Sequence, residues 1–239
     1  MKDKEEIIFY FSKDQIKLSE ITKDGLMMIN LEINTSELIS NQYNVEKPEY
    51  PVKLNLENLC KLMQLKKKDG FKIFKTGNKN DIFIKLISQD DGNSNVENCS
   101  NLTTLPFINN ISIDIPEYKR NEPNCIVSLR KFSEMCKSMG KLNCSHIIAT
   151  GFSRSVNFKS VIENEDIGQG VFFGEVDDDN NSENNKIKMA SKYIKKLAKL
   201  SNLTPNGIIK IFIEDNKPIK FICPVGNYAK LKIYIKNES

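Results

Sequence analysis

The side chains with the clearest capacity for chemistry in this sequence are lysines that recur at helical spacing. Lys192, Lys195 and Lys199 lie three or four residues apart, with Lys196 between them, and no acidic residue stands in this run. Residues at that spacing share one face of a helix, so they predict a basic stripe opposite the apolar Ile194. Like charges one turn apart destabilise a helix by roughly a few tenths of a kcal/mol per pair, so a stripe of one sign favours an anionic partner.

Two further segments carry lysines in the same way. The segment RKFSEMCKSMGK places Lys137 and Lys141 one turn apart, and ENLCKLMQLKKK places Lys61 before the lysines at 66–68. One such helix alone is typical of an ordinary solvated face, whereas three related helices favour a phosphate backbone that is bound without reading sequence. No aromatic residue is interleaved with these lysines, so duplex nucleic acid is favoured over stacked single strands.

Residues for catalysis or metal binding are sparse. Six cysteines contain no CxxC pair, and His146 is the single histidine, so the cysteines are interpreted as buried free thiols and no zinc site is predicted. Motifs for nucleotide binding, metalloproteolysis and serine nucleophiles do not occur. The aspartates at 177–179 and Asp90 lie in DDDNNSENN and SQDDGNSNVENCSN, which are typical of polar surface loops. We therefore predict no catalytic residue, no metal and no cofactor, with a metal-dependent nuclease as the least favoured alternative.

The composition limits the class of protein. The chain has 239 residues, of which 39% are hydrophobic and 28% are charged, with a net charge of +4. Such a chain can bury a core without disulfides, and it has no apolar run close to the roughly 18 residues that span a membrane. The acidic, polar start does not resemble a secretory signal, so we expect an intracellular protein without a membrane partner.

A repeat organises the predicted elements. Three segments, 57–87, 130–161 and 191–224, each combine a short helix with two strands joined by a polar turn, and residues 5–33 give strands without a helix. This repeat predicts an α+β protein in which helices pack on antiparallel strands in two similar domains. A change in composition near residues 88–117 places the N-terminal domain at 1–102, a connector at 103–117 and the C-terminal domain at 118–239.

Several segments, taken in order, resemble the DNA sliding clamps of the proliferating cell nuclear antigen (PCNA) family. They are IKLSEITKDGLMMINL, VKLNLENLCKLM, IDIPE, KFSEMCKSMGK, IGQGVFF and YIKKLAKLSNLTPNGIIKIFIEDNKPIKFIC. The resemblance implies the DNA clamp fold and a homotrimeric ring around duplex DNA, without enzymatic activity. It also implies partnership with a DNA polymerase, other clamp-binding proteins and a clamp loader, in the nucleus or at a viral replication site.

The resemblance also implies three sets of site residues. The lysines facing DNA would be Lys61, Lys137, Lys141, Lys192, Lys195 and Lys199. A pocket for partner peptides would be formed by Ile21, Leu26, Met28, Ile113, Ile115, Pro218 and Tyr234. Subunits would join by pairing edge strands at 81–88 and 170–176, through Ile82, Ile84, Leu86, Val171 and Phe173.

The match lacks the family's first strand and first helix, which indicates either a start further upstream or a shortened clamp. Glu134 also stands where the family often has a basic residue. Two alternatives therefore stay open. One is a checkpoint-type subunit of a hetero-trimer, and the other is a clamp-fold interaction module that does not encircle DNA.

Overall fold

Antiparallel strands dominate the computed structural model of the protein. It describes residues 6–37, 50–55, 57–58, 70–75, 81–89, 95–103, 116–142, 144–161, 169–175, 185–204 and 206–238. Two compact units are present, one from Met1–Leu18 and Asn44–Ser112, the other from Ser19–Tyr43 and Ile113–Ser239. Residues 19–43 thus group with the C-terminal part of the chain, while the domain boundaries drawn at 102 and 117 stay predictions.

Strand pairing gives the reason for that grouping. Strand β3 (Met27–Asn34) pairs antiparallel with β15 (Ala229–Ile235) over seven residue pairs, from Met27 with Ile235 to Ile33 with Ala229. The boundary between the units falls within β2 (Gln15–Ile21). A 3₁₀ turn, η1 (Thr35–Glu37), follows β3.

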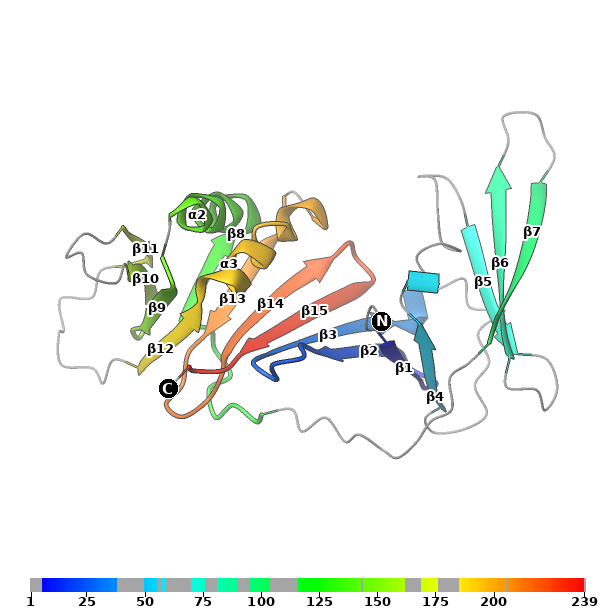
Figure 1. Ribbon diagram of the computed structural model, residues 1–239, viewed down its shortest axis with the longest axis horizontal. Helices are drawn as coiled ribbons and strands as arrows, with labels where there is room; N and C mark the ends of the chain where they lie inside the picture. The colour runs from blue at the N-terminus through cyan, green and yellow to red at the C-terminus, as the bar shows by residue number, and fades with distance from the viewer. Residues whose placement is uncertain are drawn as a thin grey trace. The chain divides into compact units, whose positions relative to one another are not determined.

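The C-terminal unit contains two antiparallel sheets (Figure 1). In the larger one, β3 and β15 continue, in order, into β14 (Ile219–Val225), β13 (Ile208–Phe212) and β8 (Cys125–Ser128). The smaller sheet has the order β11 (Gly170–Gly174), β10 (Ser155–Val161), β9 (His146–Gly151) and β12 (Asn185–Ala190). The predicted hairpins β9–β10 and β13–β14 are confirmed.

Helix α2 (Leu129–Lys141) begins at Ser128, whose side chain accepts a hydrogen bond from the backbone N–H of Lys131 at 3.3 Å. The spacing of Phe132, Met135, Cys136 and Met139 predicts one apolar stripe on this helix, and all four are buried. Leu129 and Ser133 are buried as well. Helix α3 (Ser191–Leu197) is shorter than the predicted helix, and the 3₁₀ turn η3 (Leu200–Asn202) follows it. Lys199 therefore lies just beyond the α-helix.

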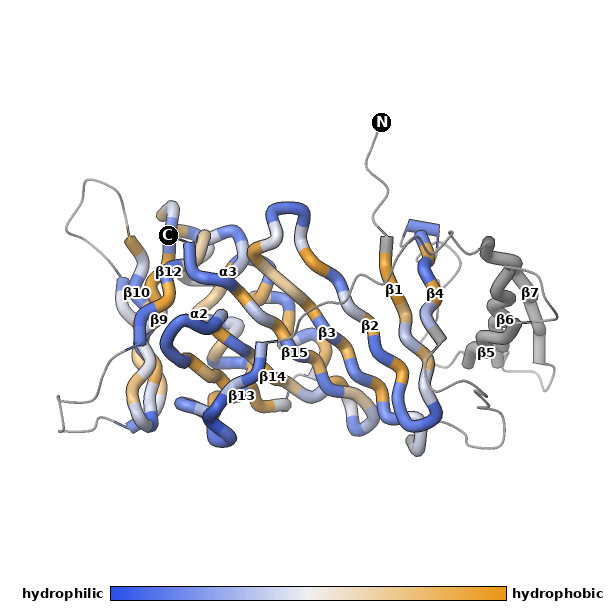
Figure 2. Tube along the Cα trace, turned by 90° about the horizontal axis from the view of Figure 1, so that it is seen from below, coloured by the Kyte–Doolittle hydropathy of each residue, from blue (hydrophilic) through white to orange (hydrophobic). Residues whose placement is uncertain are grey.

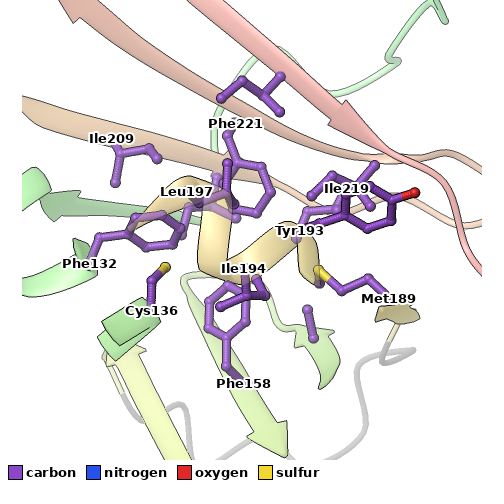
Figure 3. Close-up of a cluster of buried hydrophobic side chains, with 14 of the residues drawn as sticks. Phe132, Cys136, Phe158, Met189, Tyr193, Ile194, Leu197, Ile209, Ile219 and Phe221 are labelled. Atoms are coloured by element: carbon purple, nitrogen blue, oxygen red, sulfur yellow. The ribbon is translucent and has the colours of Figure 1, made fainter. Parts of the chain in front are cut away.

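The core of this unit lies between the two helices and the strands (Figure 3). Phe132 of α2 contacts both Phe158 and Phe221, with ring centroids 6.2 and 5.5 Å apart. Tyr193, Ile194 and Leu197 bury the apolar side of α3 in the same core. Figure 2 shows the complementary pattern, with hydrophilic stretches along both helices and alternating hydropathy along the strands.

The N-terminal unit contains β1 (Glu6–Phe11), which pairs antiparallel with β4 (Tyr50–Asn55). A second sheet has the order β5 (Gly70–Lys75), β6 (Asp81–Gln89) and β7 (Asn95–Thr103). The hairpin β5–β6 was predicted, but β7 corrects the sequence analysis, which interpreted residues 95–101 as part of a polar loop. Nine residue pairs with β6 hold this Asn-rich strand along one side, so the ladder overrides its poor intrinsic preference.

Helices in the part of the chain that the structure describes are all too short or too polar to cross a membrane.

Candidate functional site

Helices α2 and α3 pack against each other (Figure 1). Of the predicted lysines, Lys137 and Lys141 lie on α2 and Lys192 and Lys195 lie on α3. Gly140 of α2 lies at the contact between the helices, where an added Cβ would lie 3.0 Å from Cγ of Lys195. Both helices bury their apolar sides in one core, so their exposed side chains point away from it. We define the lysine surface as the exposed Lys137, Lys141, Lys195 and Lys199.

The lysine surface is not accompanied by acids on α3, but α2 has mixed charge. Arg130 pairs with Glu134 one turn later, with Nε and Oε1 separated by 3.2 Å, and both side chains are largely exposed. Pairs of this kind contribute little to stability, because solvent screens them. Lys61, the remaining lysine predicted on the first helix, lies outside the described residues.

Lys192 departs from the predicted stripe of one sign. Its Nζ lies 2.6 Å from Oδ2 of Asp24, a residue in the turn between β2 and β3. The charge of this lysine is therefore balanced within the C-terminal unit. Sequence spacing could not reveal the pair, because 168 residues separate its members.

Asp24 is held by donors on both of its carboxylate oxygens. The hydroxyl of Thr22 donates to Oδ1 at 2.6 Å, and the backbone N–H of Leu26 donates to Oδ1 at 3.3 Å. Tyr193 donates its hydroxyl hydrogen to Oδ2, beside the ammonium of Lys192. Hydrogen bonds from Lys192, Thr22 and Tyr193 hold the pKa of Asp24 well below its usual range, and the bond to Asp24 raises the pKa of Lys192.

Four of the residues predicted to form a partner pocket lie in the C-terminal unit, on or next to strands β3, β14 and β15. They are Leu26, Met28, Pro218 and Tyr234. Met28 and Tyr234 are cross-strand neighbours on β3 and β15, and both are buried. Leu26 is half-buried, and its carbonyl accepts a hydrogen bond from the backbone N–H of Lys236 at 2.8 Å. Pro218 is connected to Tyr234 through Tyr118, which contacts both.

The other predicted pocket residues are less well supported by the structure. Ile21, at the end of β2, is 44% exposed. Ile113 and Ile115 lie outside the described residues. Of the predicted pocket, the structure therefore connects Met28, Tyr234 and Pro218 to one another.

Tyr118 and Lys220 are the residues of this region that the sequence analysis missed. The hydroxyl of Tyr118 donates to the carbonyl of Pro218 at 2.6 Å, and its ring centroid lies 6.2 Å from that of Tyr234. Nζ of Lys220 lies 3.6 Å from the centroid of the Tyr118 ring and 4.1 Å from that of Phe212. We call Met28, Tyr118, Pro218, Lys220 and Tyr234 the aromatic cluster.

Burial shifts the pKa values of the ionisable side chains in the aromatic cluster. It raises the pKa of Tyr234 to about 12 and raises that of Tyr118 further, so both phenols stay protonated at physiological pH. Burial also lowers the pKa of Lys220 from its ordinary value. A cavity of about 770 Å³ opens beside Pro218, with a mixed lining that includes Pro116, Glu117, Glu214, Lys217 and Lys236. The region thus offers apolar rings next to charged groups of both signs.

The predicted subunit interface needs a correction. Strand β6 is paired with β5 on one side and with β7 on the other, so Ile82, Ile84 and Leu86 lie on an interior strand. Its backbone groups are engaged in two ladders and are not available to another subunit. Among the described strands of this sheet, the outer positions belong to β5 and β7.

Strand β11, the other predicted interface strand, does lie at the edge of its sheet. Val171 and Phe173 are half-buried and pack on the core, and the ring of Phe173 lies 6.2 Å from that of Phe158. The exposed side chain is Phe172, at 42%, which contacts Phe152. An edge strand with an exposed aromatic residue can accept another strand.

The described residues contain no group of three or more His, Cys, Asp or Glu side chains placed to hold a metal ion. Cys125, Cys136, Cys144 and Cys223 are buried free thiols, as predicted. Burial raises the pKa of Cys223 to about 11 and raises those of Cys125 and Cys136, which keeps these thiols protonated and unreactive.

Comparison with solved structures identifies the fold. A chain in the crystal structure of the PCNA2-PCNA3 complex from Sulfolobus tokodaii is similar to this chain with a TM-score of 0.74 and 16% sequence identity. The similarity covers 98% of this chain and 90% of that one. The protein has the DNA clamp fold, an α+β fold of antiparallel sheets and few helices. No family model and no curated protein matches the sequence.

Proposed function

We propose that this protein is a subunit of a DNA sliding clamp, a ring that encircles duplex DNA and tethers a DNA polymerase and other DNA enzymes to it. The observation that carries the proposal is the lysine surface on the packed helices α2 and α3 of a clamp fold. Lysines attract phosphates without reading bases, as a protein that moves along any sequence requires. The clamp performs no bond chemistry.

Encirclement supports the work of a polymerase through effective concentration. A polymerase bound to a ring that cannot leave the duplex rebinds locally after each dissociation, so its processivity rises without any new contact to DNA. Apolar residues of such clients would bind at the surface beside the aromatic cluster, and a clamp loader would open the ring. The site of action would be the nucleus, or a viral replication site if the source is a virus.

The ring would close through edge strands. On the described residues, β11 provides one edge, and β5 or β7 replaces β6 as the source of the other. Three identical subunits would make a homotrimer through such head-to-tail contacts. A hetero-oligomeric ring is a second candidate, because the similar solved structure is a complex of two different chains.

Solution mass by light scattering at several protein concentrations tests the ring. A mass of three subunits supports the homotrimer, whereas a stable monomer in the absence of other chains favours a hetero-oligomer or an interaction module without DNA. The matched functional test compares the native chain with a variant in which Lys137, Lys141, Lys195 and Lys199 are changed to Ala. Loss of duplex affinity and of its salt dependence at unchanged mass is expected, and unchanged affinity would contradict the proposed DNA surface.

A further inference from the structure

The turn between β2 and β3 presents a carboxylate to the first turn of α3. Asp24 lies 2.6 Å from the ammonium of Lys192 and accepts further hydrogen bonds from Thr22, Tyr193 and the backbone of Leu26. Its position is thus determined by four donors, of which Lys192 is one. Removing Lys192 would leave the other three in place.

The lysines of the lysine surface have a different environment. Among the described residues, no ion pair involves Lys195 or Lys199, and none involves Lys137 or Lys141 on α2. An unpaired lysine binds a phosphate and releases a condensed counter-ion, which is the origin of salt-dependent affinity. A lysine that already contacts a carboxylate must exchange one anion for another, so its gain from a phosphate is small.

We infer that Asp24 acts as an internal counter-ion that removes Lys192 from the DNA-binding set and so limits the affinity of the clamp for duplex DNA. The inference rests on the proposed function. It assigns a role to Asp24, which lies 168 positions from Lys192 in the sequence. It also excludes Lys192 from the residues predicted to face DNA.

Four variants of the full chain test the inference: Asp24→Asn, Lys192→Ala, Asp24→Asn with Lys192→Ala, and Lys199→Ala. Asp215→Asn is the matched control, since it removes one negative charge from the exposed β13–β14 turn. Fluorescence anisotropy with a labelled linear duplex of about 30 base pairs, titrated at 50 to 200 mM salt, gives affinity and salt slope. Circular dichroism and solution mass confirm that each variant is folded and assembled.

The expected results follow from counting phosphate contacts. Lys199→Ala reduces the salt slope by about 0.9 per phosphate lost, which corresponds to about 3.5-fold in affinity between 50 and 200 mM salt. Lys192→Ala leaves the slope unchanged. Asp24→Asn steepens it by about 0.9 per phosphate gained, and this gain disappears in the double variant. Asp215→Asn has no effect on the slope.

Three results would overturn the inference. One is that Lys192→Ala reduces the salt slope as much as Lys199→Ala does. Another is that the steeper slope of Asp24→Asn persists in the double variant. The third is an equal gain for Asp215→Asn, which would show an effect of net charge alone. These results leave the clamp proposal standing, whereas a native chain without duplex affinity would overturn both proposals. If Asp24→Asn did not fold, the comparison of Lys192→Ala with Lys199→Ala would still decide.

Discussion

The hydroxyl of Tyr118 donates a hydrogen bond of 2.6 Å to the backbone carbonyl of Pro218, a residue 100 positions further along the chain. This bond joins the segment before β8 to the start of β14. The ring of Tyr118 also contacts both the ring of Tyr234 and the ammonium of Lys220. One side chain thus contacts three other members of the aromatic cluster.

Changing Tyr118 to Phe is expected to lower the free energy of unfolding by about 1 kcal/mol, because the carbonyl of Pro218 loses its donor while the ring remains. Urea denaturation measures this loss. Tyr228→Phe, at an exposed turn, is the control and is expected to change stability by less than about 0.5 kcal/mol. Equal effects of the two changes would contradict a structural role for the Tyr118 hydroxyl.

Acid is expected to weaken the contact between Asp24 and α3. The pKa of Asp24 is lower in the folded chain than its ordinary value of 3.8, so the stabilisation is complete above pH 4 and is lost as the pH falls further. Asp24→Asn is therefore expected to be less stable than the native chain at pH 7, with a difference that shrinks at pH 3. Denaturant unfolding at both pH values measures it. A difference independent of pH would show that charge does not contribute.

Gly174 is expected to tolerate no side chain at the end of β11. Its φ is +108°, and an added Cβ would lie 2.3 Å from the carbonyl oxygen of Arg154. Gly174→Ala is expected to lower stability by at least about 1–3 kcal/mol through backbone strain alone. Gly170→Ala, at the other end of the strand, meets no atom closer than 3.8 Å and is the control. Thermal unfolding compares the two variants, and equal melting temperatures would contradict the claim that position 174 requires glycine.

Phe132 is expected to be a major contributor to the core of the C-terminal unit. It is fully buried and contacts the rings of Phe158 and Phe221 (Figure 3). Phe132→Ala is expected to lower the free energy of unfolding by about 3–5 kcal/mol. Leu203→Ala, at an exposed position, is expected to change it by less than about 0.5 kcal/mol. Calorimetry or urea unfolding measures both changes. A loss for Leu203→Ala as large as that for Phe132→Ala would contradict the role of Phe132 in the core.

Local patterns predicted most of the described C-terminal unit. The spacing of Phe132, Cys136 and Met139 identified the buried side of α2, and polar turns between alternating strands identified the β9–β10 and β13–β14 hairpins. These features depend on contacts within a few residues, where the period of a helix or strand is visible in the sequence. Strand β7 was missed because its Asn-rich composition is typical of a loop and only its pairing with β6 makes it a strand.

The sequence by itself determined which residue types line each element: lysines on the exposed sides of α2 and α3, and apolar residues on their buried sides. Tertiary structure alone decided that β6 is an interior strand, that Asp24 pairs with Lys192 and that Tyr118 bonds to Pro218 in the aromatic cluster. The physical reason is range. Amphipathic periodicity acts between neighbours in the chain, whereas strand order and the pairing of residues 100 or 168 positions apart depend on how the whole chain closes around its core.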